Sequence, residues 1–201
     1  MNDELFFHVS HNSSNELIPL QSYLFNTKNA IFLTGQINSE KASLVIQQII
    51  ALSLEGKPIT MFITSGGGEI SAGLAIMDAM ESCGVPVSTV VVDRAYSMAA
   101  VIATSGKRRY ILKNSKIFLH QPLIHEFGGN VSEVEKLSEE MKGVKQKINQ
   151  ILAANCKKTI EEVGEVTDKD TYFNAEEALK WNLVDYMVTD IHDVWEGEEN
   201  V

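Results

Sequence analysis

Short apolar runs that alternate with helical segments constrain the fold of this chain more than any other feature. Three of these runs are continuous and rich in β-branched residues, as is typical of strands buried on both faces of a sheet; they cover residues 30–35, 59–64 and 87–92. A helical segment follows each run, at residues 39–54, 70–82 and 98–104. This alternation predicts an α/β fold in which helices cover a parallel sheet.

The remaining segments extend one domain without dividing it. Shorter strands are predicted over residues 110–112, 116–120 and 183–188, and a short helix over 175–181. The 201 residues contain no internal repeat and no Gly/Ser-rich linker, which indicates a single domain with appendages. We expect a mobile arm over residues 1–21, the domain over 22–190 and a loose acidic tail over 191–201.

Charge and cysteine content exclude several classes of function. The formal net charge of −10 argues against nucleic acid as a partner, because phosphate binding needs clustered basic side chains. The only compact basic cluster, Lys107 to Arg109, is expected to be a solvated loop. Cys83 and Cys156 show no metal-ligand or disulfide-framework spacing, which suits a reducing compartment. With no signal-peptide pattern and no membrane-length apolar run, we expect a cytoplasmic protein without a membrane partner.

A long, highly charged helix is predicted over residues 131–157. Its apolar residues recur at alternating steps of three and four and form a narrow seam; they are Val134, Leu137, Met141, Val144, Ile148 and Ile151. Lysine and glutamate fill the other faces. Such a helix can lie on its own domain, or it can project and pack against a second copy. The narrow seam favours the second arrangement and hence oligomerisation.

Ser97 lies where an apolar strand gives way to a helix of small residues. The first N–H groups of a helix have no intrahelical partners, and the local dipole favours negative charge. Serine hydrolases place their nucleophile on a strand-to-helix corner of this kind. A serine that merely caps the helix is the commoner use of such a position. Both interpretations stay open for this residue alone.

His120 is the strongest candidate for a base that would activate Ser97. It ends a predicted strand, and active sites of α/β folds collect at the carboxyl edge of a parallel sheet. His125, in the following loop, is a weaker candidate. Asp168 and Asp170 precede the last predicted helix, and either one is a candidate to orient the imidazole. The alternative is that both are solvated turn residues.

Three consecutive glycines, Gly66 to Gly68, follow the strand at 59–64. A Walker-type phosphate loop would end in Gly-Lys-Ser/Thr, whereas Glu69 places a negative charge where phosphate would lie. The remaining alternatives are a connecting loop and an oxyanion hole, in which a glycine N–H acts with the N–H of Met98. Glycine suits an oxyanion hole because it lets the backbone approach a substrate closely.

Together these residues resemble the ClpP family, the proteolytic subunits of ATP-dependent Clp proteases. The matching segments keep the family's order and nearly its spacing between about residues 22 and 188. They lie at residues 31–36, 62–68, 71–73, 96–100, 114–115, 120–122, 170 and 183–185. The resemblance implies a crotonase-like α/β domain with a protruding handle over about residues 123–158.

The resemblance also implies catalytic roles for individual residues. Ser97 would be the nucleophile, His120 the base and Asp170 the carboxylate that orients the base. The backbone N–H groups of Gly68 and Met98 would form the oxyanion hole.

Substrate binding is implied for Gly67, Tyr96, Gly128 and Gly129. The last two fall where the family has a glycine-containing strand of the handle, beside bound peptide. Tyr96 stands where the family has a small residue, and we expect its ring to narrow the substrate site. Gly66 replaces a proline of the family, which loosens the turn.

The function implied by the resemblance is that of a serine endopeptidase acting on unfolded polypeptides inside a tetradecamer of two stacked heptameric rings. An AAA+ ATPase would feed this barrel and would alone use ATP, so no cofactor or metal is expected on this chain. Thr60 and Ser82 occupy positions where the family has aromatic residues for docking the ATPase. Two alternatives stay open: a catalytically weak or structural subunit of mixed rings, and an acyl-CoA enzyme of the crotonase fold. The acyl-CoA enzyme has no need of aligned Ser97, His120 and Asp170.

Overall fold

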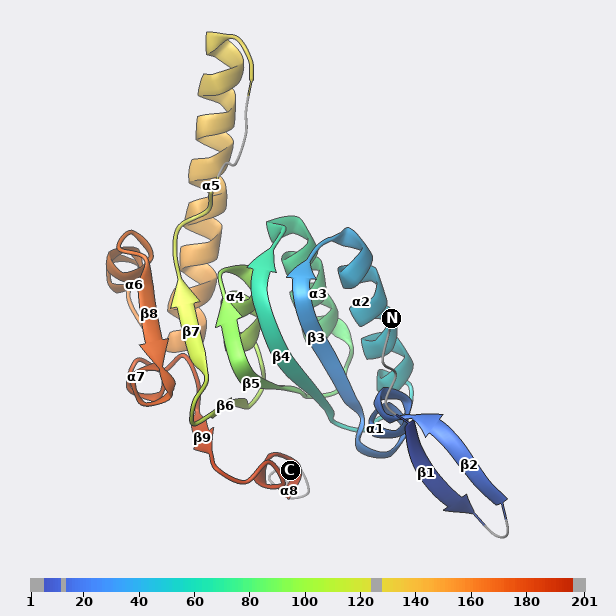
Figure 1. Ribbon diagram of the computed structural model, residues 1–201. Helices are drawn as coiled ribbons and strands as arrows, with labels where there is room; N and C mark the ends of the chain where they lie inside the picture. Colours follow the sequence, from blue (N-terminus) through green and yellow to red (C-terminus); the bar gives the residue numbers. More distant parts are fainter. Residues whose placement is uncertain (1–5, 12–13, 124–127, 197–201) are drawn as a thin grey trace.

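A computed structural model describes residues 6–11, 14–123 and 128–196 of the chain. Its main element is a seven-stranded sheet. The strands of this sheet are β3 (Ala30–Ile37), β4 (Ile59–Gly68), β5 (Val87–Tyr96), β6 (Arg109–Leu112), β7 (Lys116–Leu119), β8 (Thr171–Asn174) and β9 (Tyr186–Val188). Their order is β3-β4-β5-β6-β9, and β7 pairs with both β5 and β8 (Figure 1). Every pairing is parallel except that of β7 with β8.

Helices cover this sheet. They are α1 (Leu20–Lys28), α2 (Ser39–Ser53), α3 (Ile70–Ser82), α4 (Met98–Thr104), α5 (Val131–Cys156), α6 (Ile160–Thr167), α7 (Ala175–Lys180) and α8 (Asp193–Glu196). Helices α2, α3 and α4 pack beside one another behind β3, β4 and β5 (Figure 1). The structure therefore confirms the predicted α/β fold with a parallel sheet covered by helices.

On the edge that faces away from β4, the strand β5 pairs with two different strands along its length. Its first half pairs with β6 through Thr89–Val91, and its second half pairs with β7 through Arg94–Tyr96. Asp93 lies between the two halves with a positive φ of 70°. Because β5 and β7 run parallel, the residues that follow them, Ser97 and His120, come to the same edge of the sheet.

Alternate strand residues face two separate apolar clusters, because successive side chains of a strand point to opposite faces. Val91 belongs to the larger cluster, beneath α2, α3 and α4, while Phe62 and Val90 belong to the smaller cluster on the other face. Val194 of α8 is buried in the smaller cluster, and the ring of Trp195 lies 5.6 Å from that of Phe62. The start of the acidic tail is thus packed against the sheet, in contrast to the loose tail that the sequence predicts.

The N-terminal arm contains two elements that the sequence pattern does not predict. The strands β1 (Phe6–His11) and β2 (Ser14–Pro19) pair in antiparallel register, and α1 follows them directly. None of the residues of α1 is fully buried, although Leu24 and Phe25 are partly buried against the two apolar clusters, so the helix carries only a short apolar pattern. The mobility of the arm stays a prediction.

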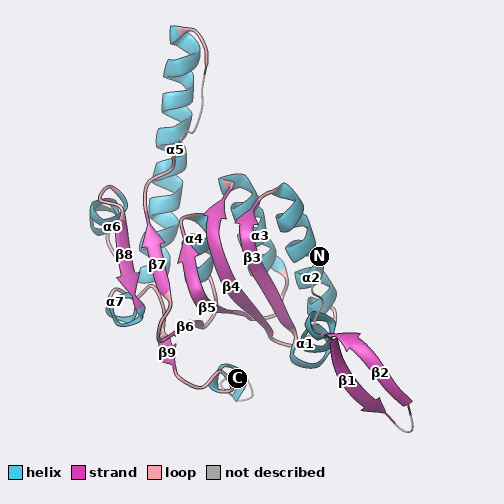
Figure 2. Cartoon of the chain, viewed as in Figure 1, coloured by secondary structure: helices cyan, strands magenta, loops and turns pink. Residues whose placement is uncertain are grey.

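Helix α5 projects well beyond the sheet (Figure 2). Its 26 residues span about 39 Å. A capping box at Asn130 starts the helix. Its buried residues, which include Ile148 and Leu152, all lie in the C-terminal half, whereas Val131 and Val134 near its start are 74% and 49% exposed. The predicted handle helix is therefore present, and its apolar seam continues beyond the core of its own domain.

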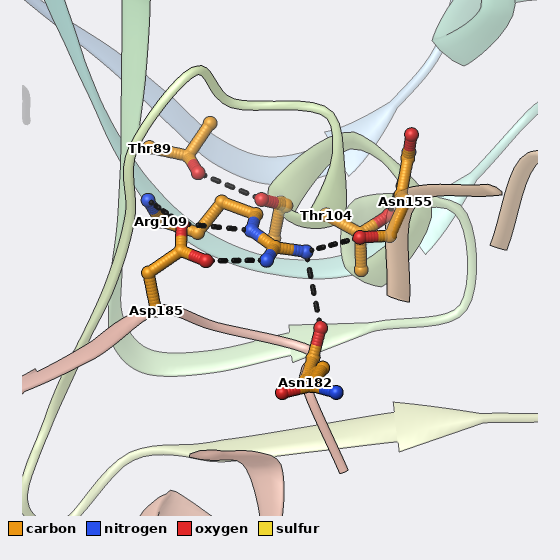
Figure 3. A network of polar contacts seen from close by, with 7 residues as sticks. Thr89, Thr104, Arg109, Asn155, Asn182 and Asp185 are labelled. Carbon is orange, nitrogen blue, oxygen red and sulfur yellow. Dashed lines mark hydrogen bonds and ion pairs between the residues drawn. The ribbon is translucent and has the colours of Figure 1, made fainter. Parts of the chain in front are cut away.

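One buried guanidinium, that of Arg109 in β6, ties the segment before β9 and the end of α5 to the sheet (Figure 3). Arg109 is 7% exposed and donates from Nε to Asp185 Oδ2 at 3.0 Å and from Nη2 to Oδ1. Its Nη1 donates to the carbonyl oxygens of Asn155 and Asn182, at 2.8 and 3.0 Å. Burial by itself lowers the pKa of Arg109. The hydrogen bond and the negative charge of Asp185 outweigh burial, so the pKa of Arg109 is raised. The prediction that Lys107 to Arg109 form a solvated loop is therefore wrong for Arg109.

Candidate active site

Ser97 and His120 meet at the carboxyl edge of the sheet. Ser97 stands between β5 and α4, and His120 follows β7 directly. The Nε2 of His120 lies 2.7 Å from the Oγ of Ser97, which is a hydrogen-bond distance. Both residues are half-buried, so the pair borders the solvent. The structure thus brings the predicted nucleophile and the predicted base together.

The hydroxyl of Ser97 does not cap the helix that it precedes. Ser97 occupies the N-cap position of α4, yet its side chain makes no capping hydrogen bond. Its backbone has φ 55° and ψ −126°, a conformation that L residues rarely adopt. The N–H of Ser97 donates to the carbonyl oxygen of Phe118 at 2.9 Å, which helps to hold this turn. Of the two interpretations of Ser97, the geometry favours the sharp turn that presents a nucleophile.

Gly67 and Gly68 bring the end of β4 against this turn. A Cβ atom at Gly67, where φ is 91°, would lie 2.8 Å from the Cβ of Ser97 and 3.1 Å from the nitrogen of Met98. A Cβ atom at Gly68, where φ is 154°, would overlap the backbone of Ile37 in β3. Both positions therefore need glycine, because any side chain would push the strands apart and strain the backbone.

The glycine turn is braced by a serine. Ser65 is fully buried; its Oγ donates to the carbonyl oxygen of Gly35 at 2.6 Å and accepts the N–H of Gly67 at 3.0 Å. These bonds hold the turn on both sides of Gly66, the position at which the family's proline is missing. The loosening expected from that loss is therefore countered by side-chain hydrogen bonds.

Met98 places the first N–H of α4 beside the glycine turn. Its side chain is 2% exposed and packs so tightly on Gly73 of α3 that a Cβ atom there would overlap it. The first N–H groups of a helix lack intrahelical acceptors and suit a developing negative charge. The oxyanion hole formed by Gly68 and Met98 stays a prediction, to which the closeness of Gly67 and Met98 lends support.

Three aromatic rings line the sheet beside the serine. Tyr96, Phe118 and Tyr172 lie opposite one another in the register of β5, β7 and β8. Phe118 stacks on Tyr172 with ring centroids 4.2 Å apart, and Tyr96 meets both rings edge-on at 5.7 Å. Tyr96 therefore belongs to an aromatic row, and its contact with substrate stays a prediction. Sequence reasoning missed Phe118 and Tyr172, although Phe118 lies two residues before His120 and so on the same face of its strand.

The two candidate aspartates have different surroundings. Asp168 forms an ion pair with Lys145 of α5, at 2.6 Å, and its N–H bonds to the carbonyl oxygen of Gly164. Asp170 is exposed and has a positive φ of 51°, directly before β8. Among the described residues, no hydrogen bond joins Asp170 to His120. Catalytic hydrogen bonds are often long before substrate binds, and Asp170 stays the predicted orienting residue.

Gly128 and Gly129 lie directly before α5 and are exposed. Neither is part of a strand, so the glycine-containing strand that the resemblance implies is not formed at these two positions. A Cβ atom at Gly128 would meet nothing within 4 Å. A contact of these glycines with peptide stays a prediction, and His125, the weaker candidate base, lies outside the described residues.

No metal site is found within the described ranges, where no three histidine, cysteine, aspartate or glutamate side chains are grouped to hold an ion. Nor does any helix of those ranges combine the length and apolar character needed to cross a membrane. Cys156 is buried, and burial raises the pKa of its thiol to about 12 despite the opposing charge of Arg109.

The fold and this site define a class of protein. An α/β sheet that presents a serine hydroxyl on a strained strand-to-helix turn, within hydrogen-bond distance of an imidazole, has the arrangement of a serine hydrolase. The family model of the Clp protease matches residues 12–190, and the chain belongs to this family. The match begins within the N-terminal arm and ends just beyond β9, the last strand of the sheet.

Proposed function

We propose that this chain is a serine endopeptidase that cleaves unfolded polypeptides. The distance of 2.7 Å between Ser97 Oγ and His120 Nε2 carries the proposal. Membership of the Clp protease family supports the same chemistry. An acyl-CoA enzyme of related fold would not need a serine hydroxyl directed at an imidazole, so the pair favours the peptidase.

The first half of the reaction forms an acyl-enzyme. Ser97 Oγ attacks the carbonyl carbon of the peptide bond, and its proton passes to His120 Nε2. The carbonyl oxygen becomes an oxyanion, which the N–H groups of Gly68 and Met98 stabilise. The C–N bond then breaks, the leaving amine takes the proton from His120, and an ester on Ser97 remains.

The second half of the reaction hydrolyses this ester. A water molecule attacks the ester carbon and gives a proton to His120, and the new oxyanion occupies the same hole. The bond to Ser97 breaks, Ser97 recovers its proton from His120, and a carboxylic acid product leaves. Asp170 orients the imidazole in both halves.

Projecting helix α5 supports a function inside a closed oligomer. A groove of about 450 Å³ lies between α5 and the segment after β7; its lining includes Gln121, Pro122, Val134, Leu137, Met141 and Lys145. Exposed apolar side chains on a projecting element mark an interaction surface. The proposed assembly is a barrel of two stacked heptameric rings fed by an AAA+ ATPase, in which only unfolded chains reach Ser97.

Replacement of the nucleophile tests this function. Ser97→Ala is expected to lower the cleavage of a fluorogenic peptide by at least about a thousandfold, with an unchanged oligomer mass in light scattering. A fluorophosphonate should label the wild-type protein at Ser97 and leave the variant unlabelled. An assembled wild type that is neither labelled nor active would overturn the proposal and favour a structural subunit of mixed rings.

A further inference from the structure

Phe118 contacts both members of the proposed catalytic pair. Its carbonyl oxygen accepts the N–H of Ser97 at 2.9 Å. Its ring stacks on the imidazole of His120, with centroids 5.1 Å apart and ring planes 16° from parallel. One residue thus joins the backbone of the nucleophile to the ring of the base.

The ring of Phe118 is itself held by its neighbours. Tyr172 stacks on it at 4.2 Å with an angle of 25° between the planes, and Tyr96 meets it edge-on at 75°. These rings come from three adjacent strands, and cross-strand aromatic pairs restrict one another's rotation. Phe118 therefore presents a fixed flat surface to His120.

His120 needs a contact that fixes the plane of its ring. The terminal torsion of a histidine side chain has broad minima, so the imidazole plane is weakly defined by the backbone alone. In serine proteases a carboxylate bonded to Nδ1 usually sets this plane. Among the described residues, the hydrogen bond of the His120 side chain is the one to Ser97, and Asp170 is exposed.

We infer that Phe118 is a positioning residue of the active site: by stacking, its ring holds the imidazole of His120 in line with the Oγ of Ser97. This inference rests on the proposed peptidase function. The contact is specific to the side chain, because the hydrogen bond to the N–H of Ser97 uses only the carbonyl oxygen of Phe118.

The variant Phe118→Leu removes the ring while it keeps an apolar side chain and the carbonyl oxygen. We expect kcat for a fluorogenic peptide to fall on the order of tenfold with KM unchanged, because a looser imidazole affects the chemical step alone. The rate of fluorophosphonate labelling at Ser97 should fall by the same factor. Phe118→Tyr keeps the ring and should recover most of the lost rate.

A matched variant separates positioning from general loss of aromatic packing. Tyr186 of β9 stacks on Tyr110 at 5.2 Å with planes 27° apart, a similar pair on a strand that joins β6 rather than β7. Tyr186→Leu should keep the wild-type kcat and labelling rate. If Phe118→Leu does not fold, Phe118→Met replaces it, since methionine fills irregular space well.

The outcomes separate this inference from the proposed function. A wild-type rate in Phe118→Leu, no recovery in Phe118→Tyr, or a loss confined to KM would each overturn the inference and leave the peptidase function standing. A wild-type protein that neither cleaves the peptide nor reacts with fluorophosphonate would overturn the proposed function, and the inference with it.

Discussion

Gly67 and Ser97 approach so closely that no side chain fits between the end of β4 and the turn after β5. A Cβ atom at Gly67 would lie 2.8 Å from the Cβ of Ser97 and 2.6 Å from the carbonyl oxygen of Tyr96. The two strand ends therefore meet backbone to backbone beside the hydroxyl. The direction of the N–H groups around Ser97 depends on this contact.

Gly67→Ala should lower kcat by about a hundredfold, because the methyl group pushes the turn away from Ser97 and strains a backbone with φ 91°. Peptide cleavage and thermal unfolding measure the two effects. Gly66→Ala is the matched control, since a Cβ atom there meets nothing within 4 Å and φ is not positive. Full activity in Gly67→Ala would show that the turn tolerates displacement.

Gly73→Ala should displace Met98, whose side chain occupies the space that the new methyl group needs. We expect a loss of about 1–3 kcal/mol in the free energy of unfolding from overpacking, together with a lower kcat. Urea denaturation and peptide cleavage measure these changes. Gly143→Ala, in open space on α5, should instead stabilise the protein by about 0.5–1 kcal/mol. Equal effects of the two variants would contradict this account.

Asp170→Asn should lower kcat by at least about a hundredfold if Asp170 orients the imidazole, because the amide favours the wrong tautomer of His120. Asp168→Asn is its neighbour control: it removes the partner of Lys145, a half-exposed ion pair that contributes at most about 1 kcal/mol. Steady-state kinetics of both variants decide the assignment. A loss of kcat in Asp168→Asn alone would transfer the orienting role to Asp168.

Asp185 should make the stability of the protein depend on pH. Burial favours its neutral form, but the hydrogen bond and charge of Arg109 prevail and lower the pKa of Asp185 below its ordinary value. A lowered pKa in the folded state contributes stability above the unfolded value and loses it as pH falls through the folded value. In urea unfolding, the advantage of wild type over Asp185→Asn should be constant from pH 7 to about pH 5 and shrink below about pH 4. An advantage that does not change with pH would contradict the ion pair.

The two cysteines should differ in reactivity. Burial raises the pKa of the Cys156 thiol to about 12, so this thiol stays neutral at pH 8. The stability that the neutral buried thiol contributes is lost as pH rises from 9 toward 12. Cys83 is only half-buried. A disulfide reagent at pH 8 should modify one thiol in the native protein and two in urea. In the native Cys83→Ser variant, no thiol should react quickly with the reagent. A fast reaction of the remaining thiol would refute the burial of Cys156.

Local patterns account for most of the fold. The apolar runs at 59–64 and 87–92 are strands, and both continue further than predicted, to Gly68 and Tyr96, because parallel neighbours extend their pairing. The pattern missed β8, in which Phe173 alone is buried, so its four residues form no apolar run. It also missed α6, although the capping box of Thr159 and Glu162 is a readable signal.

The site was predictable where its residues occupy strand ends. Ser97 precedes a helix of small residues and His120 ends an apolar strand, so their positions follow from local sequence. The contact between Phe118 and Tyr172 was not predictable, because it forms through the pairing of β7 with β8, more than fifty residues apart in the chain.

The sequence by itself determined the α/β class, the projecting helix, and the placement of Ser97 and His120 at strand ends, since periodicity and turn chemistry are local properties. Only the tertiary structure decided that the Ser97 hydroxyl lies against His120 instead of capping α4, that Asp168 pairs with Lys145, and that Phe118 stacks on Tyr172. The physical reason is that strand register and helix packing set distances of a few ångströms between residues remote in the chain, and no local pattern records them.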